Sequence, residues 1–383
     1  MIGQRTAITQ ITAQDQRGIY YRNIDGLRFI AFLLVFSSHI DIGFTGWFSA
    51  LHKNGYIGVE LFFVISSFLL TKLLVIEAER SSAGSVAVRN YFLRRVLRIW
   101  PLYFGFVAAM VMRRVWIGGG IDLTRIISLA TFTENLWTAI VGYDSAFPDV
   151  AHLWTISLEE QYYLLLPFMI PILLKVSKRV LLLGGVAVVG VLMINRAVAV
   201  ILGMPHPFTY VLPISGDAFV LGTMLGLGVF DHILSHVPNW AKYAITVVAL
   251  GWTFFLPYVG TGGYADVIRY TLYAIGFTTL LAAVLSNRAK VARVILGNRP
   301  VRYLGKISYG LYVFHLLVIS MVQAHISAHV GNWVGATSHL FAPICWIAAL
   351  VLTIVVSAAS YEVFERRFLR LKERFATVRS RPI

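Results

Sequence analysis

The sequence predicts an all-α polytopic membrane protein, a bundle of about ten transmembrane helices with a candidate for an additional short re-entrant helix. Three observations support this fold class. Of the 383 residues, 58% are hydrophobic and only 13% are charged, about half the charged fraction of a typical soluble domain. The apolar residues fall into blocks of roughly 17–25, the length that crosses about 30 Å of hydrocarbon as a helix. None of these blocks alternates apolar and polar residues as membrane strands do.

The order of the apolar blocks gives the domain organisation. The ten predicted spans are 26–44, 56–77, 99–116, 155–175, 180–202, 209–230, 241–258, 267–286, 307–329 and 341–364. Segment 124–141 contains Glu134 and Asn135, so a re-entrant or interfacial helix suits its polarity better than an eleventh span. Residues 1–21 are expected to form a cytosolic N-terminal tail, 22–368 one transmembrane domain, and 369–383 a basic cytosolic C-terminal tail.

The distribution of basic residues predicts the orientation. With ten spans and a cytosolic N-terminus, most lysines and arginines fall in cytosolic loops and in the C-terminal tail, which is the positive-inside pattern. Arg113 and Arg114 are exceptions on the opposite side. The net charge of +15 therefore reports topology, and we expect membrane lipids and no nucleic acid among the partners. The expected location is the cytoplasmic (inner) membrane, with both termini cytosolic.

Two ionisable side chains in the first span share one helical face. Arg28 and His39 are eleven residues apart, close to three turns, so they project in the same direction about 16 Å apart. Arg28 lies near the cytosolic surface, where snorkelling alone would explain it. His39 lies deeper, where a functional role is favoured over a hydrogen bond between helices. Neutral imidazole can take a proton from a hydroxyl near pH 7.

The second span carries Glu60 one turn into the bilayer at its outer end. A carboxylate at this depth needs a partner, and His39 is a candidate, although a structural role for Glu60 is equally open. Ser66 and Ser67 follow, and small side chains of this kind allow helices to pack closely.

An arginine cluster precedes the third span. Arg94 and Arg98 are spaced i, i+4 and share a helical face, and Arg95 lies between them in sequence. Such a cluster can serve topology alone. The functional alternative is a cytosolic site for a phosphorylated ligand, because a guanidinium group holds phosphate with two hydrogen bonds.

Polar residues crowd the outer end of the fourth span. Ser157 and Glu160 have the spacing of a capping box, which would explain Glu160 structurally. The same explanation does not cover Glu159, Gln161 or His152. The functional alternative is that these side chains line a site at this end of the bundle.

Other chemistry-bearing features are sparse. Asp217 in the sixth span and His315 in the ninth are lone ionisable residues, which are often structural. The single cysteine, Cys345, lies in an apolar block, so neither a disulfide framework nor a Cys-based metal site is expected. The sequence has no Gly-x-Ser-x-Gly elbow, no phosphate-binding Gly-rich loop with lysine and no His-Glu-x-x-His pair, and we expect no metal.

Six blocks in order resemble the acyltransferase-3 family, which includes O-antigen and exopolysaccharide acetyltransferases. The blocks are 28–39, 58–68, 94–103, 154–163, 304–315 and 360–366, and the resemblance covers nearly all of the predicted transmembrane domain. The most specific is the run Trp154-Thr-Ile-Ser157-Leu-Glu159-Glu160-Gln161-Tyr-Tyr. Three positions depart from the family pattern. Glu60 stands where the family usually has Asp, Ser67 where it has Gly, and Gly216 where an arginine often precedes the aspartate.

The resemblance implies a membrane O-acyltransferase. Such an enzyme moves an acyl group, most often acetyl from acetyl-CoA, to a hydroxyl of a glycan, a lipid-linked sugar or a small hydroxylated acceptor. In the expected mechanism His39 is the general base, and the catalytic set is completed by Glu60, Glu159 and Glu160. The CoA phosphates are expected to bind the cytosolic arginines Arg28, Arg94, Arg95 and Arg98. The expected substrate-binding residues are His152, Trp154, Ser157, Gln161 and His315.

Two other classes of function fit parts of the pattern. A transporter or flippase of a glycan or lipid-linked intermediate also needs intramembrane charges and a central cavity. A membrane scaffold without activity is the third class, and turnover of labelled acetyl-CoA separates it from an enzyme.

Overall fold

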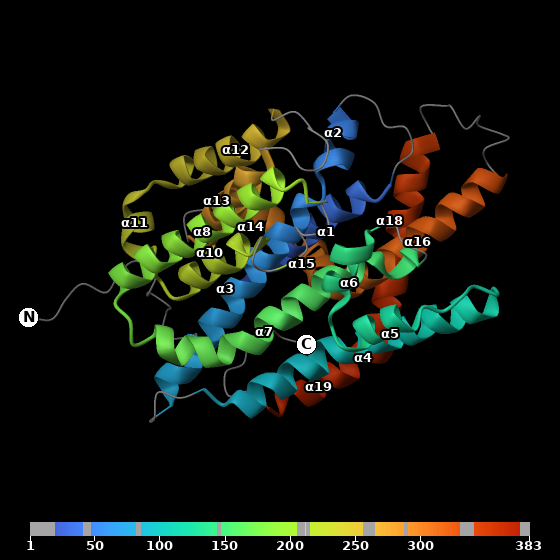
Figure 1. The fold of residues 1–383 in the computed structure, drawn as a ribbon, viewed down its shortest axis with the longest axis horizontal. Coiled ribbons are helices and arrows are strands. Elements are labelled where there is room, and N and C mark those ends of the chain that lie inside the picture. Colours follow the sequence, from blue (N-terminus) through green and yellow to red (C-terminus); the bar gives the residue numbers. More distant parts are fainter. Residues whose placement is uncertain are drawn as a thin grey trace, which may run out of the picture.

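The computed structural model describes residues 20–40, 47–81, 86–143, 147–204, 211, 215–255, 265–286, 290–329 and 341–375. Most of these residues are helical, with no strand among them, which confirms the all-α prediction. The chain order is α1 (Arg22–Ser38), α2 (Trp47–Asn54), α3 (Ile57–Arg80), α4 (Val88–Trp116), α5 (Leu123–Ala130), α6 (Glu134–Val141), η2 (Pro148–Leu153), α7 (Trp154–Leu173), α8 (Lys178–Ile201), α10 (Asp217–Gly226), α11 (Asp231–His236), α12 (Asn239–Phe255), α13 (Ala265–Leu285), α14 (Lys290–Leu296), α15 (Arg299–Lys306), α16 (Ser308–His329), α18 (Phe341–Ser360), η4 (Tyr361–Glu365) and α19 (Arg366–Glu373) (Figure 1).

The structure supports fewer full-length spans than the sequence suggested. Among the described residues, five helical segments are long and apolar enough to cross a membrane, namely Leu51–Arg80, Val88–Trp116, Lys178–Ile201, Val267–Leu285 and Pro343–Glu373. The pair α15 and α16, which meets at a bend of 72°, adds a sixth if it is counted as one span. The count of ten is not confirmed. One reason is length, because α1 and α12 have 17 residues each, about 25 Å of helix, and α10 has ten.

Segment 124–141 folds as two short helices. α5 and α6 have 8 residues each, about 12 Å of helix, so neither is long enough to cross a membrane alone. A turn separates them, in which Phe132 has a φ of 55°. This length argues against an eleventh span here.

α3 is the central helix of the bundle. It packs against α1, α7, α10 and α13, and 78% of its most apolar stretch is buried (Figure 1). Gly58 lets α3 approach α1, because a Cβ at this position would collide with the carbonyl oxygen of Ala31. Ser67, where the family usually has glycine, faces Gly222 of α10. The missing side chain at Gly222 therefore makes room for the serine.

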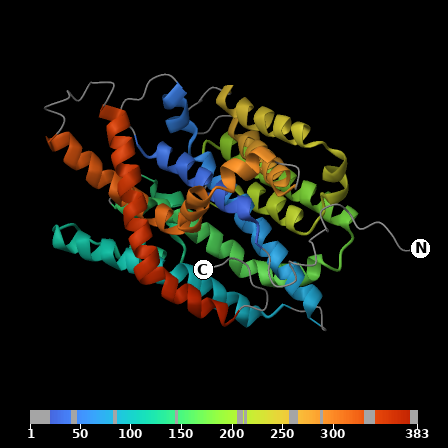
Figure 2. The same cartoon turned by 180° about the vertical axis from the view of Figure 1, so that it is seen from behind.

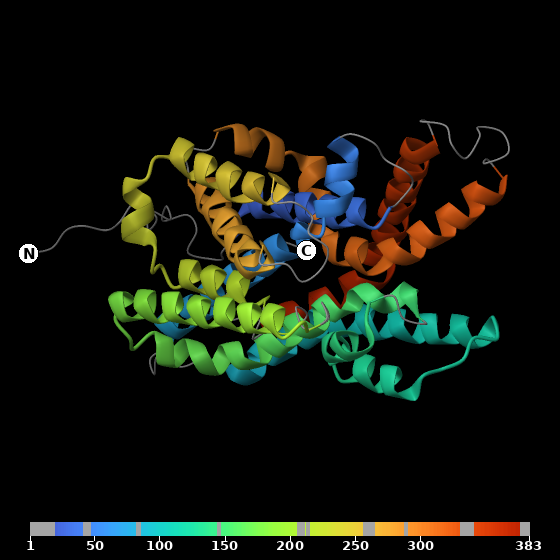
Figure 3. The same ribbon diagram turned by 45° about the horizontal axis from the view of Figure 1, so that its top comes forward.

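α4 is longer than the predicted third span, since it begins at Val88 and includes the whole arginine cluster. Pro101 lies inside this helix and does not start it. The C-terminal helix α19 packs along the same end of α4, at the foot of the red segment that faces the viewer in Figure 2. Figure 3 shows α4, α5 and α6 on one side of the molecule, away from α12 and α13. The arginine cluster lies near the start of α4, whereas α5 and α6 lie against its middle and its far end.

Candidate active site

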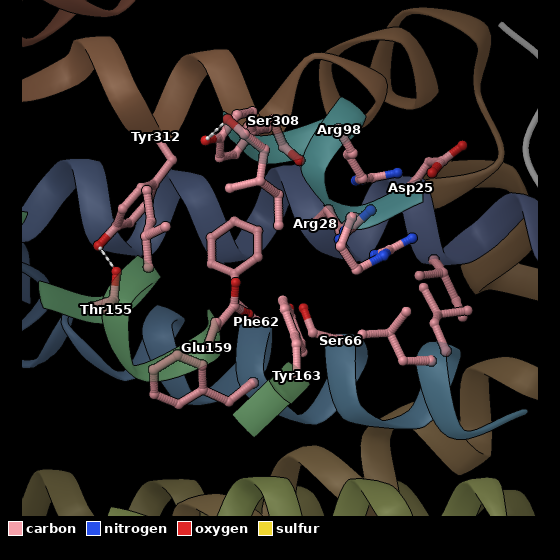
Figure 4. A pocket seen from close by; sticks show the side chains of 18 of the residues that line it. Asp25, Arg28, Phe62, Ser66, Arg98, Thr155, Glu159, Tyr163, Ser308 and Tyr312 are labelled. Atoms are coloured by element: carbon pink, nitrogen blue, oxygen red, sulfur yellow. Dashed lines mark hydrogen bonds between the residues drawn. The ribbon is translucent and has the colours of Figure 1, made fainter. Parts of the chain in front are cut away.

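An elongated cavity of about 150 Å³ opens between α1, α3, α4, α7 and α16 (Figure 4). Most of its lining is apolar, and Arg28, Arg95 and Arg98 give it one charged end. The polar lining residues are Tyr20, Tyr21, Asp25, Arg28, Ser66, Arg95, Arg98, Thr155, Glu159, Tyr163, Ser308, Tyr309 and Tyr312. The cavity is therefore the natural place for a ligand with a charged end and a long, uncharged remainder.

Three arginines gather at one end of the cavity. Arg28 of α1 lies opposite Arg95 and Arg98 of α4, so residues from separate sequence blocks meet here (Figure 4). The Nε atoms of Arg28 and Arg95 are buried and have no hydrogen-bond partner among the described residues. Asp25 lies in the same lining and accepts a hydrogen bond from the Tyr20 hydroxyl at 2.7 Å. The excess of positive charge suits an anion such as phosphate.

Arg94 does not line this cavity. Its Nη2 donates to Glu77 Oε2 at 2.8 Å, and both side chains of this ion pair are 4% exposed. Its Nη1 donates to the carbonyl oxygen of Phe375 at 3.3 Å, which ties the C-terminal segment to α4. The arginine that joins Arg98 at the cavity is Arg95.

The glutamates expected around His39 lie elsewhere. Glu159 is in the cavity wall, where it interacts with the Ser66 and Tyr163 hydroxyls and with the charges of Arg28 and Arg98. Glu160 lies outside the cavity lining and accepts a hydrogen bond from Trp100 Nε1 at 3.4 Å.

The capping-box explanation for Glu160 does not hold. α7 begins at Trp154, so Ser157 lies inside the helix, and no side chain caps its start.

Glu60 faces a second polar centre. Its nearest charges are Asp217 and Arg196, and it makes no recorded contact with His39. Arg196 of α8 donates to both carboxylate oxygens of Asp217, at 2.6 and 3.2 Å, and both side chains are at most 2% exposed. The arginine that the family often places before this aspartate is thus supplied from α8. A lone arginine inside the fifth apolar block was the sequence signal for it.

Three histidines lie close together beyond the end of the cavity that Tyr312 lines. His39 follows the last residue of α1, His152 lies in η2 and His315 in α16. The ring centroid of His315 lies 5.0 Å from that of His39 and 4.9 Å from that of His152. His152 and His315 are at most 1% exposed. Among the described residues, no group of three His, Cys, Asp or Glu side chains has an arrangement that could hold a metal ion.

The hydrogen bonds of His39 define its tautomer. Nδ1 lies 2.8 Å from the carbonyl oxygen of Val35, which can only accept, so Nδ1 carries the proton. In the neutral ring Nε2 is then an acceptor, and the hydroxyl of Tyr143 donates to it at 3.0 Å. The lone pair of His39 therefore already faces a hydroxyl group, and a backbone carbonyl orients the ring where a glutamate was expected to do so.

Tyr312 separates the cavity from the histidines. It lines the cavity, and its ring centroid lies 5.4 Å from that of His152 and 5.3 Å from that of His315. Its hydroxyl lies 2.6 Å from Thr155 Oγ1, and both hydroxyls are within 3.1 Å of the His152 carbonyl oxygen (Figure 4). The cavity and the histidine cluster are thus separated by one side chain and are not continuous.

The other three residues expected to bind substrate, Gln161, Trp154 and Ser157, contact neighbouring parts of the protein and do not face the cavity. Gln161 exchanges two hydrogen bonds with Asn135 of α6, at 3.2 and 2.7 Å, and donates to the Phe132 carbonyl oxygen at 2.9 Å. It thereby fixes α6 to α7. Trp154 packs against the main hydrophobic core, and Ser157 is fully buried. None of these three lines the cavity.

Comparison with known proteins gives consistent relatives. Peptidoglycan O-acetyltransferase OatA of Listeria monocytogenes is 25% identical over 321 residues, which are 79% of this chain and 50% of the relative. A Staphylococcus aureus (strain COL) protein with the name "Putative O-acetyltransferase" is 26% identical, with 91% of this chain and 57% of the relative covered. For the Bacillus subtilis "Putative peptidoglycan O-acetyltransferase YrhL" the values are 25%, 92% and 55%.

The chain spans about half the length of these curated relatives. No solved structure matches it. The model of an acyltransferase domain matches residues 21–362, which include Arg28, His39, Glu159 and Tyr312. The chain therefore belongs to the acyltransferase-3 family.

Proposed function

We propose that this chain transfers an acetyl group from acetyl-CoA to a hydroxyl of a cell-surface glycan, with His39 as the general base. The observation that carries the proposal is the hydroxyl-facing Nε2 of His39, one tyrosine away from an arginine-lined cavity. The names of the relatives favour acetyl as the acyl group and a glycan as the acceptor. The protein acts in the cytoplasmic membrane, with both termini in the cytosol.

The donor enters from the arginine end. The phosphates of CoA bind Arg28, Arg95 and Arg98, whose guanidinium groups match phosphate oxygens. The uncharged pantetheine arm follows the cavity away from the arginines and brings the thioester to Tyr312. Glu159 sets the spacing of the arginines, because it interacts with Arg28 and Arg98 from the opposite wall. Arg94 supports the site indirectly by holding α3, α4 and the C-terminal segment together.

The acceptor enters from the histidine side. A sugar hydroxyl takes the position that Tyr143 occupies at His39 Nε2. His39 removes the proton as the hydroxyl oxygen attacks the thioester carbonyl carbon. The C–S bond then breaks, the ester forms, and the imidazolium returns the proton to the leaving thiolate. His315 and His152 flank the base and exclude water from it.

Tyr312 must move for this reaction to occur. With the Tyr312–Thr155 hydrogen bond in place, the histidines do not line the cavity. Rotation of the Tyr312 ring joins the two compartments, and its hydrogen bonds close them again when no donor is bound. This arrangement keeps the thioester away from water until the acceptor side is filled.

The test is acetyl transfer by purified protein, with labelled acetyl-CoA and a chitin tetrasaccharide as acceptor. His39→Ala should reduce the rate at least about 100-fold, the lower range for the loss of a general base. The control is His236→Ala, since His236 is exposed on α11, and its rate should equal that of the wild type. Full activity of His39→Ala would refute the base assignment. Movement of unmodified saccharide across vesicles without acetylation would favour the transporter alternative.

A further inference from the structure

The outer end of α4 carries a second cavity that the proposed reaction does not use. It has a volume of about 40 Å³ and lies between α4, α5, α6 and the start of η2. Its charged and aromatic lining side chains are Arg114, Asp122, Arg125, Trp137 and Phe147. In the expected topology this is the side of the membrane on which basic residues are scarce. Arg114 therefore needs an explanation other than orientation.

The arginines around this cavity differ in whether they form an ion pair with a carboxylate. Arg113 pairs with Asp149 at 2.5 Å, and Arg125 pairs with the buried Glu134 at 2.9 Å. Arg114, in contrast, makes no ion pair with a carboxylate of the described residues. Its Nε donates to the carbonyl oxygen of Gly120 at 3.2 Å, and its two Nη atoms make no hydrogen bond to the described residues. One half-buried guanidinium group is thus available for an anion.

Asp122 does not neutralise this guanidinium. Its side chain accepts a hydrogen bond from the backbone N–H of Thr124 at 2.9 Å and another from the Thr124 hydroxyl, so it caps α5. It is also exposed to solvent, where an ion pair is weak.

Aromatic rings form the other half of the lining. The Arg114 guanidinium lies 5.6 Å from the ring centroid of Phe147, and the Arg125 guanidinium lies 4.3 Å from that of Trp137. Trp137 is half-buried and Phe147 is 9% exposed. Rings of this kind offer apolar faces to the C–H groups of a sugar, and Arg114 offers two donors in a plane to a carboxylate. The combination fits a sugar that carries a carboxylate better than a neutral sugar.

The second cavity is linked to the histidine cluster by a short rigid element. Phe147 directly precedes η2, and η2 carries His152 near its other end. Five residues of 3₁₀ helix at about 2 Å per residue place these backbones about 10 Å apart. His152 belongs to the same cluster as His39. A glycan unit held at Phe147 would therefore be a neighbour of the unit that reacts at His39, and not the reacting unit itself.

We propose that this cavity binds the carboxylate group of a sugar of the acceptor glycan, next to the unit that is acylated, with Arg114 as the carboxylate ligand. This inference rests on the proposed acetyl transfer to a glycan. Binding energy from a unit that does not react should act mainly on the KM for the acceptor.

The direct test is saccharide binding to the full chain in nanodiscs, without acyl donor. The probes are a tetrasaccharide of alternating N-acetylglucosamine and glucuronic acid, and the neutral N-acetylglucosamine tetramer. The carboxylated probe should bind about tenfold more tightly, as one charge-assisted hydrogen-bonded pair provides. Arg114→Gln should abolish this preference, and Trp137→Ala should weaken binding of both probes. Equal binding of the two probes, no binding of either, or a preference that survives Arg114→Gln would overturn the proposal.

Matched controls separate the site from general effects. Arg179→Gln removes an exposed arginine at the start of α8, and Trp116→Ala removes a tryptophan that is 89% exposed; both should leave binding unchanged. His39→Ala should abolish acetylation and keep the binding preference. If wild-type protein shows the Arg114-dependent preference but no acetylation, the proposed function fails while the binding site stands. If the wild-type protein acetylates both probes with equal KM, the proposed function stands and the carboxylate site fails.

Discussion

Replacing Asp217 with Asn tests how α8, α10 and α13 are held together. The carboxylate accepts two hydrogen bonds from Arg196 and a third from the Thr271 hydroxyl at 2.6 Å. Arg196 Nε also donates to the carbonyl oxygen of Val267 at 2.8 Å. Asp217→Asn keeps the shape of the side chain but removes its charge. It therefore leaves the buried Arg196 guanidinium group without the carboxylate that compensates its charge.

The size of the effect follows from burial. Breaking a buried ion pair by removing one partner costs about 3–5 kcal/mol, mainly because the remaining charge is uncompensated. A neutral hydrogen bond between membrane helices contributes only about 0.6 kcal/mol on average, so loss of charge compensation decides the outcome. The amide oxygen of asparagine can still accept a hydrogen bond from Arg196, which offsets part of the loss. We therefore expect a loss near the lower end, about 3 kcal/mol.

The assay is denaturant unfolding of the purified protein in mixed micelles. The control is Glu362→Gln, which breaks the ion pair with Arg366, whose side chains are 47% and 39% exposed, and should cost less than about 1 kcal/mol. The double variant Arg196→Met/Asp217→Leu should be more stable than Asp217→Asn, because no charge stays buried alone. If Asp217→Asn loses no more stability than Glu362→Gln, the reasoning is wrong.

Three further predictions concern the cavity and its surroundings. Arg98→Gln should raise the KM for acetyl-CoA about tenfold with kcat unchanged, because one phosphate contact is lost. Arg94→Gln should leave this KM unchanged and lower the stability of the protein, because Glu77 is left buried without its ion-pair partner. Tyr312→Ala should increase acetyl-CoA hydrolysis without acceptor, and Tyr312→Phe should increase it less; equal hydrolysis in all three proteins would contradict the partition. Gln161→Ala should increase proteolysis in α6, and unchanged protection would argue against its role in fixing that helix.

The sequence was most informative where the relevant periodicity is local. Apolar blocks predicted helices because helix formation and burial depend on neighbouring residues. The eleven-residue spacing of Arg28 and His39 predicted two chemistries at separate levels of one helix, and the structure places Arg28 in the cavity and His39 beyond it. The count of ten spans was not confirmed among the described residues, and hydropathy alone does not report where a helix breaks, as at the bend before α16.

Contacts between segments that are distant in the chain could not be predicted from the sequence. The i, i+4 spacing of Arg94 and Arg98 is correct on the helix, yet the rotation of α4 turns Arg94 to Glu77 and Arg95 to the cavity. One residue is 100° of helix rotation, so a single step decides which side chain enters a site. Glu60 turns towards α8 and α10 for the same reason. Tyr143 and Tyr312 were not singled out, since nothing local marks a tyrosine that meets a histidine from another helix.

In the proposed mechanism the donor binds on the arginine side, and the acceptor reaches His39 from the opposite face of the membrane. Sealed proteoliposomes with labelled acetyl-CoA on the inside and chitin tetrasaccharide on the outside test it most directly. We predict labelled saccharide on the outside with wild-type protein and none with His39→Ala. Label that appears only when donor and acceptor share one side of the membrane would contradict the account.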